Sequence, residues 1–100
     1  MRWGTVLVAG SSMEPALRAG DMLLVGYGAR VRPADVVVVA LPGGRPLSVK
    51  RAVQHTSDGW WVEGDNAGAS TDSRQVGAVA DEAVLGRVVL RYWPRPRRVS

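Results

Sequence analysis

The sequence predicts a small all-β domain. Its apolar runs are short and rich in β-branched residues, which is typical of strands. Clusters of Gly, Pro, Asp and Ser separate these runs at a spacing of about 10–15 residues, as in small β domains. The chain has 100 residues, of which 46% are hydrophobic and 22% charged, so we expect one globular domain.

Six strands are predicted, and a turn-forming segment separates each from the next. A helical turn is predicted at residues 14–17, because Pro15 is tolerated in a first turn, where its missing N–H is not needed. Pro94 ends the last strand. The predicted strands cover residues 5–9, 22–27, 35–41, 47–54, 59–63 and 84–92.

The net charge of +4 does not by itself indicate nucleic-acid binding. Several of the basic residues gather at the Pro-broken C-terminus, and the others are scattered, so we expect no nucleic-acid partner. We predict a single domain over residues 1–93 and a solvated basic tail over residues 94–100. The basic residues of this C-terminal cluster are Arg91, Arg95, Arg97 and Arg98.

Composition excludes several kinds of site. The chain contains no cysteine, which excludes disulfides, thiolate metal ligands and a cysteine nucleophile. No run approaches the roughly 18 apolar residues that cross a bilayer, and the start of the chain is too short for a secretory signal. We therefore expect a protein without a transmembrane segment that acts in the cytoplasm.

Ser12 is a candidate nucleophile in the run G-S-S-M-E-P-A-L. Serines in Gly-Ser turns commonly serve the turn itself, and a serine becomes a nucleophile only when a base takes its proton. The single histidine, His55, lies in the polar turn Q-H-T-S-D and is expected at the surface. A Ser-Lys pair is the serine chemistry that remains.

Lys50 is the candidate base. In the strand pattern L-S-V-K-R-A-V, alternation places Ser48, Lys50 and Ala52 on one face. Burial would lower the pKa of the lysine, which must fall toward neutrality before the amine can act as a base. A lysine at a strand edge that extends to water is the alternative, and the strand pattern alone does not decide between them.

A third polar segment, G-D-N-A-G-A-S-T-D-S-R, covers residues 64–74. Asp72 and Arg74 are two positions apart and would lie on one side of an extended segment, where they can pair. Pairing removes a free carboxylate charge that would otherwise raise the pKa of Lys50. Ser70 offers a hydroxyl that could orient a neutral amine. A polar surface loop with one ion pair is the alternative interpretation.

Taken together and in order, these segments resemble the type I signal peptidase family of serine-lysine proteases. The shared motifs are S-M-x-P-x-L, G-D, K-R in a strand, G-D-N-x-x-x-S-x-D-S-R-x-x-G, and a closing strand V-L-G-R-V. The resemblance implies the signal-peptidase and repressor-peptidase fold of coiled antiparallel sheets.

The resemblance also implies residue roles. Ser12 would be the nucleophile, Lys50 the general base and Ser70 the residue that orients Lys50. Asp72 and Arg74 would form a supporting ion pair. The oxyanion hole would rest mainly on the Ser12 N–H, with the Gly10 backbone as a second contributor, because Gly10 stands where some members carry a serine.

Two departures from the signal peptidases are informative. Only eleven residues precede Ser12, where those enzymes usually have a membrane anchor, and only 14 positions separate Lys50 from Gly64. A short, anchorless chain with V-x-G-x-S-M-x-P-x-L and G-W-W-V-x-G-D-N-A looks most like the nickel superoxide dismutase maturation proteases. That resemblance implies a substrate, the N-terminal extension of a nickel superoxide dismutase precursor, and an enzyme that needs no metal or other cofactor.

Three alternatives stay open. One is a general signal peptidase recruited to a membrane by a partner, with tryptophans at the interface. Another is a self-cleaving repressor-type peptidase, which needs a tethered cleavage site. The last is a non-catalytic binding module of the same fold. The tryptophans concerned are Trp3, Trp60, Trp61 and Trp93.

Overall fold

Antiparallel strands make up most of the computed structural model, which describes residues 2–99. The predicted all-β fold class is confirmed. The strands form one sheet in the order β1-β2-β6-β3-β4-β5, and β7 pairs with β6. Their bounds are β1 Arg2–Leu7, β2 Met22–Tyr27, β3 Val36–Val39, β4 Ser48–Thr56, β5 Gly59–Glu63, β6 Val84–Trp93 and β7 Arg97–Arg98.

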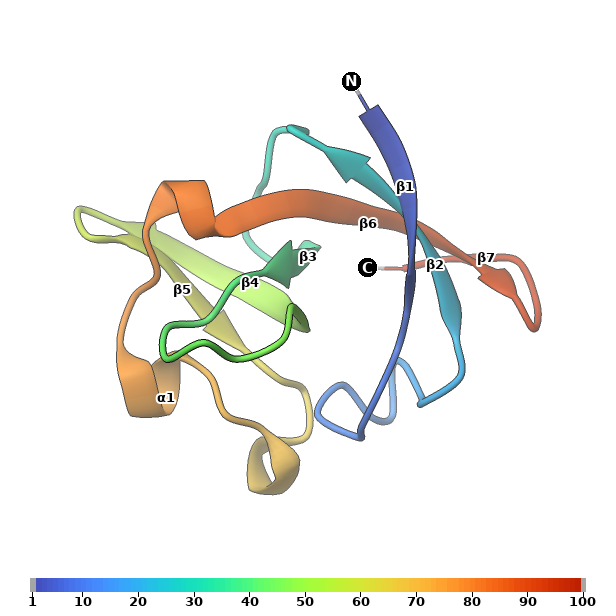
Figure 1. Cartoon of the computed structure of the whole chain (residues 1–100), viewed down its shortest axis with the longest axis horizontal. Coiled ribbons are helices and arrows are strands. Elements are labelled where there is room, and N and C mark those ends of the chain that lie inside the picture. Colours follow the sequence, from blue (N-terminus) through green and yellow to red (C-terminus); the bar gives the residue numbers. More distant parts are fainter. Residues whose placement is uncertain (1, 100) are drawn as a thin grey trace.

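Strand β6 connects the two halves of the sheet. It pairs with β2 through Leu90 and with β3 through Arg87, and it is the longest strand at ten residues. Figure 1 shows β6 running across the molecule, with β1 and β2 toward one side and β4 and β5 toward the other. The coiled sheet therefore encloses two separate apolar cores.

The four consecutive valines of β3 serve both cores. Val36 and Val38 belong to a core that they share with residues of β2 and the Met13–Leu17 region, whereas Val37 and Val39 belong to the core beneath β4 and β5. Successive side chains of a strand point to opposite faces, so a strand between two cores must be apolar at every position. This placement explains the unbroken run of valines.

Two predicted strands, β2 and β5, have the predicted bounds, whereas the first strand is shifted. We expected residues 5–9, but β1 begins at Arg2 and ends at Leu7. Pairing continues to Arg2 opposite Tyr27, and Gly4 admits the Tyr27 ring against its α-carbon. Val8 instead donates its N–H to the Asp21 carbonyl at the start of β2, which closes the loop.

Local structure departs from prediction in four segments. Residues 14–17 form no assigned helix; the segment is a series of turns with one i→i+4 bond, Leu17 N–H to Met13 O at 3.0 Å. A short helix, α1 (Ser73–Val76), was not predicted, nor were the 3₁₀ turns η1 (Ala67–Ala69) and η2 (Asp81–Ala83).

The basic tail is not free of the sheet. After Pro94 the chain turns back, and Arg97–Arg98 forms β7 against β6. The arginine side chains of β7 are exposed, while Val99 packs against the core that contains Met13 and Leu17. The boundary at residue 93 stays a prediction, but the tail makes contacts that its proline-rich sequence did not indicate.

We expect Gly59→Ala to destabilise the domain by about 2–4 kcal/mol, because it adds backbone strain to overpacking. Gly59 has φ of +122°, and a Cβ there would collide with the Val79 backbone, whose carbonyl carbon would lie 2.8 Å away. Gly44 also has positive φ (+69°) but faces open space, so Gly44→Ala should cost about 1 kcal/mol. Urea unfolding measures both; equal losses would contradict the steric argument.

Candidate active site

Ser12 lies in the loop between β1 and β2, at the start of the turns that span residues 12–16. Gly10 enters this loop with φ of +77°, a conformation that favours glycine. Met13 and Leu17 are buried and anchor the loop in the first core. The Ser12 side chain is half-buried and makes no hydrogen bond within residues 2–99, so its hydroxyl is available to a substrate or a base.

Lys50 is buried on β4, with 4% of its surface exposed. It pairs with Val37 across the sheet and shares its face with Ala52, as the alternation predicted. Burial lowers the pKa of Lys50 below its ordinary value of 10.5; the Asp72 charge opposes this, and the Arg74 charge reinforces it. The lysine is thus an interior amine and does not extend to water.

A chain of hydrogen bonds leads away from the Lys50 amine. Lys50 Nζ donates to Ser70 Oγ at 3.0 Å, and Ser70 Oγ donates to Asp72 Oδ2 at 2.5 Å. The single Ser70 proton is committed to the carboxylate, so toward Lys50 the hydroxyl can only accept. Ser70 therefore holds one N–H of the amine and leaves the rest of the nitrogen free.

The Asp72 carboxylate is fully buried and charged. Burial alone would raise its pKa, but hydrogen bonds from Arg74, Ser70 and the Gly64 N–H outweigh this, so the pKa lies well below 3.8. Arg74 binds it with two guanidinium nitrogens, Nε to Oδ1 at 3.0 Å and Nη2 to Oδ2 at 2.6 Å. The bidentate pair balances the carboxylate charge beside Lys50.

The Asp72–Arg74 pair arises from a helix start and not from the extended segment that we expected. Asp72 is the N-cap of α1, and its side chain accepts the Arg74 N–H at 3.0 Å. Gln75 completes a capping box by accepting the Asp72 N–H at 2.9 Å. The Arg74 side chain turns back over this cap, so a spacing of two positions brings the charges together by another route.

The loop that carries Ser70 also touches the Ser12 turn. Asn66 donates its backbone N–H to the Ser12 carbonyl at 2.8 Å and its side-chain amide to the Ser11 carbonyl at 3.1 Å. A Cβ on Gly64 would lie 2.6 Å from the Ser12 carbonyl oxygen and closer still to Ser70 Oγ. The Ser12 turn and the Ser70 hydroxyl are therefore neighbours across Gly64.

The sequence analysis placed Asn66 in the polar segment of residues 64–74 and missed this bridge. The amide lies 54 positions after Ser12, and no local pattern indicates such a contact. The G-D-N motif was the one available signal, because an Asn beside a candidate site offers both a donor and an acceptor.

The structure places Ser12 close to the residues that precede Lys50 on β4, without a hydrogen bond between Ser12 and Lys50. Within residues 2–99, the hydrogen bond of Lys50 Nζ goes to Ser70 and none links it to Ser12. Ser12 nevertheless lines a cavity of about 100 Å³ together with Ser48 and Val49, the two residues before Lys50. Catalytic hydrogen bonds commonly tighten only when substrate is bound.

The loop that carries Ser12 contains backbone N–H groups without a hydrogen-bond partner among the described residues. Within the described residues, the N–H groups of Gly10 and Ser12 donate no hydrogen bond. A free N–H next to a nucleophile can stabilise a developing oxyanion. The remaining walls of the cavity come from the end of β1 and the start of β4, and they are largely apolar: Val6, Leu7, Val8, Ala9, Met13 and Leu47.

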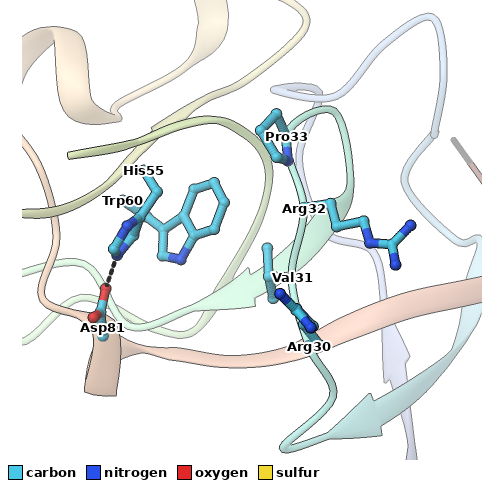
Figure 2. A pocket seen from close by; sticks show the side chains of 7 residues that line it. All are labelled: Arg30, Val31, Arg32, Pro33, His55, Trp60 and Asp81. Carbon is cyan, nitrogen blue, oxygen red and sulfur yellow. Dashed lines mark hydrogen bonds and ion pairs between the residues drawn. The ribbon is translucent and has the colours of Figure 1, made fainter.

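His55 lies in a different part of the molecule. It is exposed near the end of β4, five positions beyond Lys50, and its Nε2 lies 2.9 Å from Asp81 Oδ1. Figure 2 shows this pair and Trp60 on one side of an open cavity of about 430 Å³, opposite Val31 and its neighbours. His55 does not line the Ser12 cavity, so it is no rival base for Ser12.

Within residues 2–99, no group of three or more His, Cys, Asp or Glu side chains is placed to hold a metal ion. Among the described helices, none has the length and apolar character that crossing a bilayer requires.

Comparison with known proteins identifies the family. Residues 4–89 match the Peptidase S24-like family. The mitochondrial inner membrane protease subunit 1 of Xenopus tropicalis is 32% identical in an alignment of 114 residues, which covers 89% of this chain and 68% of that protein. The proteins of the same name from Mus musculus and Homo sapiens are 28% and 27% identical, and each alignment covers 91% of this chain and 70% of the relative.

These relatives carry protease names, and they are not nickel superoxide dismutase maturation proteases. The comparisons therefore support a peptidase and leave the predicted substrate untested. Together with the all-β fold, the match over most of the chain shows that this protein belongs to the signal-peptidase-like Peptidase S24-like family.

Proposed function

We propose that this chain is a serine endopeptidase that works through a Ser12–Lys50 dyad. The observation that carries the proposal is the buried Lys50 amine, which is held by a hydroxyl whose own proton is committed to Asp72. A neutral amine has two N–H groups and one lone pair. With one N–H on Ser70, the lone pair of Lys50 is free to accept the Ser12 proton.

The reaction would be acyl transfer. Lys50 takes the Ser12 proton as Oγ attacks the scissile carbonyl carbon, and the Ser12 and Gly10 N–H groups stabilise the resulting oxyanion. The intermediate collapses with loss of the amine, which Lys50 protonates, and an acyl-enzyme ester forms on Ser12. Lys50 then removes a proton from water, which attacks the ester, and the proton returns to Ser12.

Substrate would bind as an added strand. Strand β1 is at one end of the strand order, so its outer edge can pair with an extended segment. The Ser12 cavity adjoins the end of β1, and two exposed leucines, Leu7 and Leu47, line it. An extended segment between them would place its scissile carbonyl beside Ser12.

The proposed substrate is a precursor protein with an N-terminal extension, specifically a nickel superoxide dismutase precursor. Support for this substrate comes from the sequence motifs alone, V-x-G-x-S-M-x-P-x-L and G-W-W-V-x-G-D-N-A. The enzyme would act in the cytoplasm and without a cofactor. Incubation with the purified precursor, followed by mass spectrometry of its new N-terminus, tests the substrate directly.

A second candidate function is processing of exported proteins at a membrane surface, and one observation favours it. Trp3 and Trp93 are each 57% exposed. Strand pairing places Trp3, Leu7 and Trp93 on one face, because Leu7 and Trp93 both pair with Met22. Trp60, by contrast, packs in the second core. Aromatic side chains exposed on one face are suited to the interface of a bilayer.

Ser12→Ala and Lys50→Ala should each reduce cleavage by at least about 10²–10⁴-fold, the usual contribution of a positioned base and its nucleophile. Both variants should remain folded, and His55→Ala should retain full activity. Product formation from the precursor, or from a denatured protein substrate if the precursor is not cut, measures the effect. Full activity in Lys50→Ala would disprove the dyad.

Activity should rise with pH along an acid limb that reports loss of the Lys50 proton, because the neutral amine is the active form. Burial and the Arg74 charge lower the pKa of Lys50. Arg74→Gln removes that charge and should move the acid limb to higher pH, whereas Arg98→Gln, an equal change of charge on exposed β7, should not. A limb that stays in place in Arg74→Gln would contradict this electrostatic coupling.

Flotation with vesicles of phosphatidylglycerol and phosphatidylcholine tests the membrane candidate. If the face of Trp3 and Trp93 seats on lipid, the wild-type protein floats with the vesicles, and the Trp3→Ser/Trp93→Ser double variant stays in the dense fraction. Val53→Ser changes an exposed apolar residue elsewhere, on β4, and serves as the control. Absence of the wild-type protein from the floating fraction excludes direct association.

A further inference from the structure

The C-terminal segment contacts the loop between β1 and β2, residues 8–21, which carries Ser12 and is called the nucleophile loop below. Strand β7 pairs with β6 through Arg97 opposite Arg91 and Arg98 opposite Leu90. The turn before it is held by Arg91 Nε, which donates to the Arg95 carbonyl at 3.0 Å. The end of the chain is thereby placed beside residues that lie some eighty positions earlier.

One side chain of β7 contacts the Ser12 turn directly. The Arg97 guanidinium donates a hydrogen bond through Nη2 to the Ala16 carbonyl. Ala16 is the last residue of the turns that begin at Ser12. A hydrogen bond from a charged donor is stronger than one between neutral groups. Arg97 is therefore the residue of the tail that can fix the position of this turn.

A buried carboxylate ties the same loop to β6. Asp21 is 5% exposed; its Oδ2 accepts the Arg18 N–H at 2.9 Å and lies 3.5 Å from Arg91 Nη1. The Asp21 carbonyl accepts the Val8 N–H at 2.8 Å, which joins the two ends of the loop. Arg91 thus contacts both the turn that leads into β7 and the base of the nucleophile loop.

These contacts surround a segment that has no strand of its own. Asn66 bonds to the Ser11 and Ser12 carbonyls, whereas Arg97 and Asp21 bond to Ala16 and Arg18 farther along the loop. Val99 packs against the core that contains Met13 and Leu17, beneath the same loop. A displacement of about 1 Å in a reacting group can cost about 10²-fold in rate, so a brace on this loop affects chemistry.

We propose that Arg97 is a positioning residue for Ser12, supported by the Asp21–Arg91 pair, and that the C-terminal segment works as a brace for the nucleophile loop. The proposal rests on the proposed function of Ser12 as nucleophile. It assigns to the tail a role in positioning Ser12 although, among the described residues, no hydrogen bond links the tail to Ser12 or Lys50.

Steady-state kinetics on the full chain tests the brace. Arg97→Ala should lower kcat about tenfold and leave KM within about twofold, because the substrate site keeps its walls while the nucleophile shifts. The acid limb of the pH profile should stay in place, since Lys50 keeps its surroundings. Arg97→Lys should restore part of the rate. Arg98→Ala, which alters an exposed neighbour on β7, should match the wild type.

Amide hydrogen exchange tests the brace without any substrate. The Glu14 and Leu17 amides bond within the Ser12 turn, to Ser11 O at 3.1 Å and Met13 O at 3.0 Å. Both amides should exchange faster in Arg97→Ala and at the wild-type rate in Arg98→Ala. The Val37 and Val62 amides of the core should keep their protection in both variants.

The two experiments separate the two proposals. If the wild-type chain cleaves nothing, the proposed function fails, and the exchange rates still test the brace. If Arg97→Ala keeps wild-type exchange at Glu14 and Leu17, or keeps kcat within twofold in an active enzyme, the brace is overturned.

Discussion

The buried Asp72 carboxylate is the interaction on which the rest of the site depends. It accepts five hydrogen bonds, from the Gly64 N–H, the Ser70 hydroxyl and three groups of Arg74. The same residue caps α1, holds the only proton of Ser70 and sets the charge felt by Lys50. A buried carboxylate with fewer donors would gain a proton or distort the loop. The same carboxylate therefore stabilises the local fold at α1 and influences the pKa of the Lys50 amine.

Lys50 lies at the boundary between the second core and the loop that carries Ser70. Its strand packs one face on the second core, where Ala52 lies, and the amine reaches past that core to Ser70. Lys50 is 4% exposed and pairs with Val37 of β3, and its amine contacts Ser70 in the loop where Gly64 leaves room for Ser70 and the Ser12 carbonyl. Burying an amine costs free energy, and the compact all-β framework supplies the rigidity that keeps it buried.

Much of the fold and part of the site could be predicted from the sequence, for identifiable reasons. Alternation on β4 placed Lys50 and Ala52 on one face, but it could not say that the face is covered, because coverage depends on β3 and a distant loop. The pairing of Asp72 with Arg74 was expected from a spacing of two, though a helix cap and not an extended segment produces it. Strand β7 was missed because prolines ordinarily end pairing, and Asn66 because its partners are far along the chain.

The double role of β3 also bears on how such an enzyme survives its own activity. Alternate valines of one strand hold two cores together, and β6 pairs with strands of both halves. Neither half can then lose its packing alone, so the domain is expected to unfold as one cooperative unit. A molecule that opened by halves would present extended segments to neighbours whose proposed active sites were intact. In a domain that unfolds cooperatively, the loss of structure and the loss of the buried Lys50 amine coincide. A population of folded molecules then exposes few extended segments that another molecule could cleave.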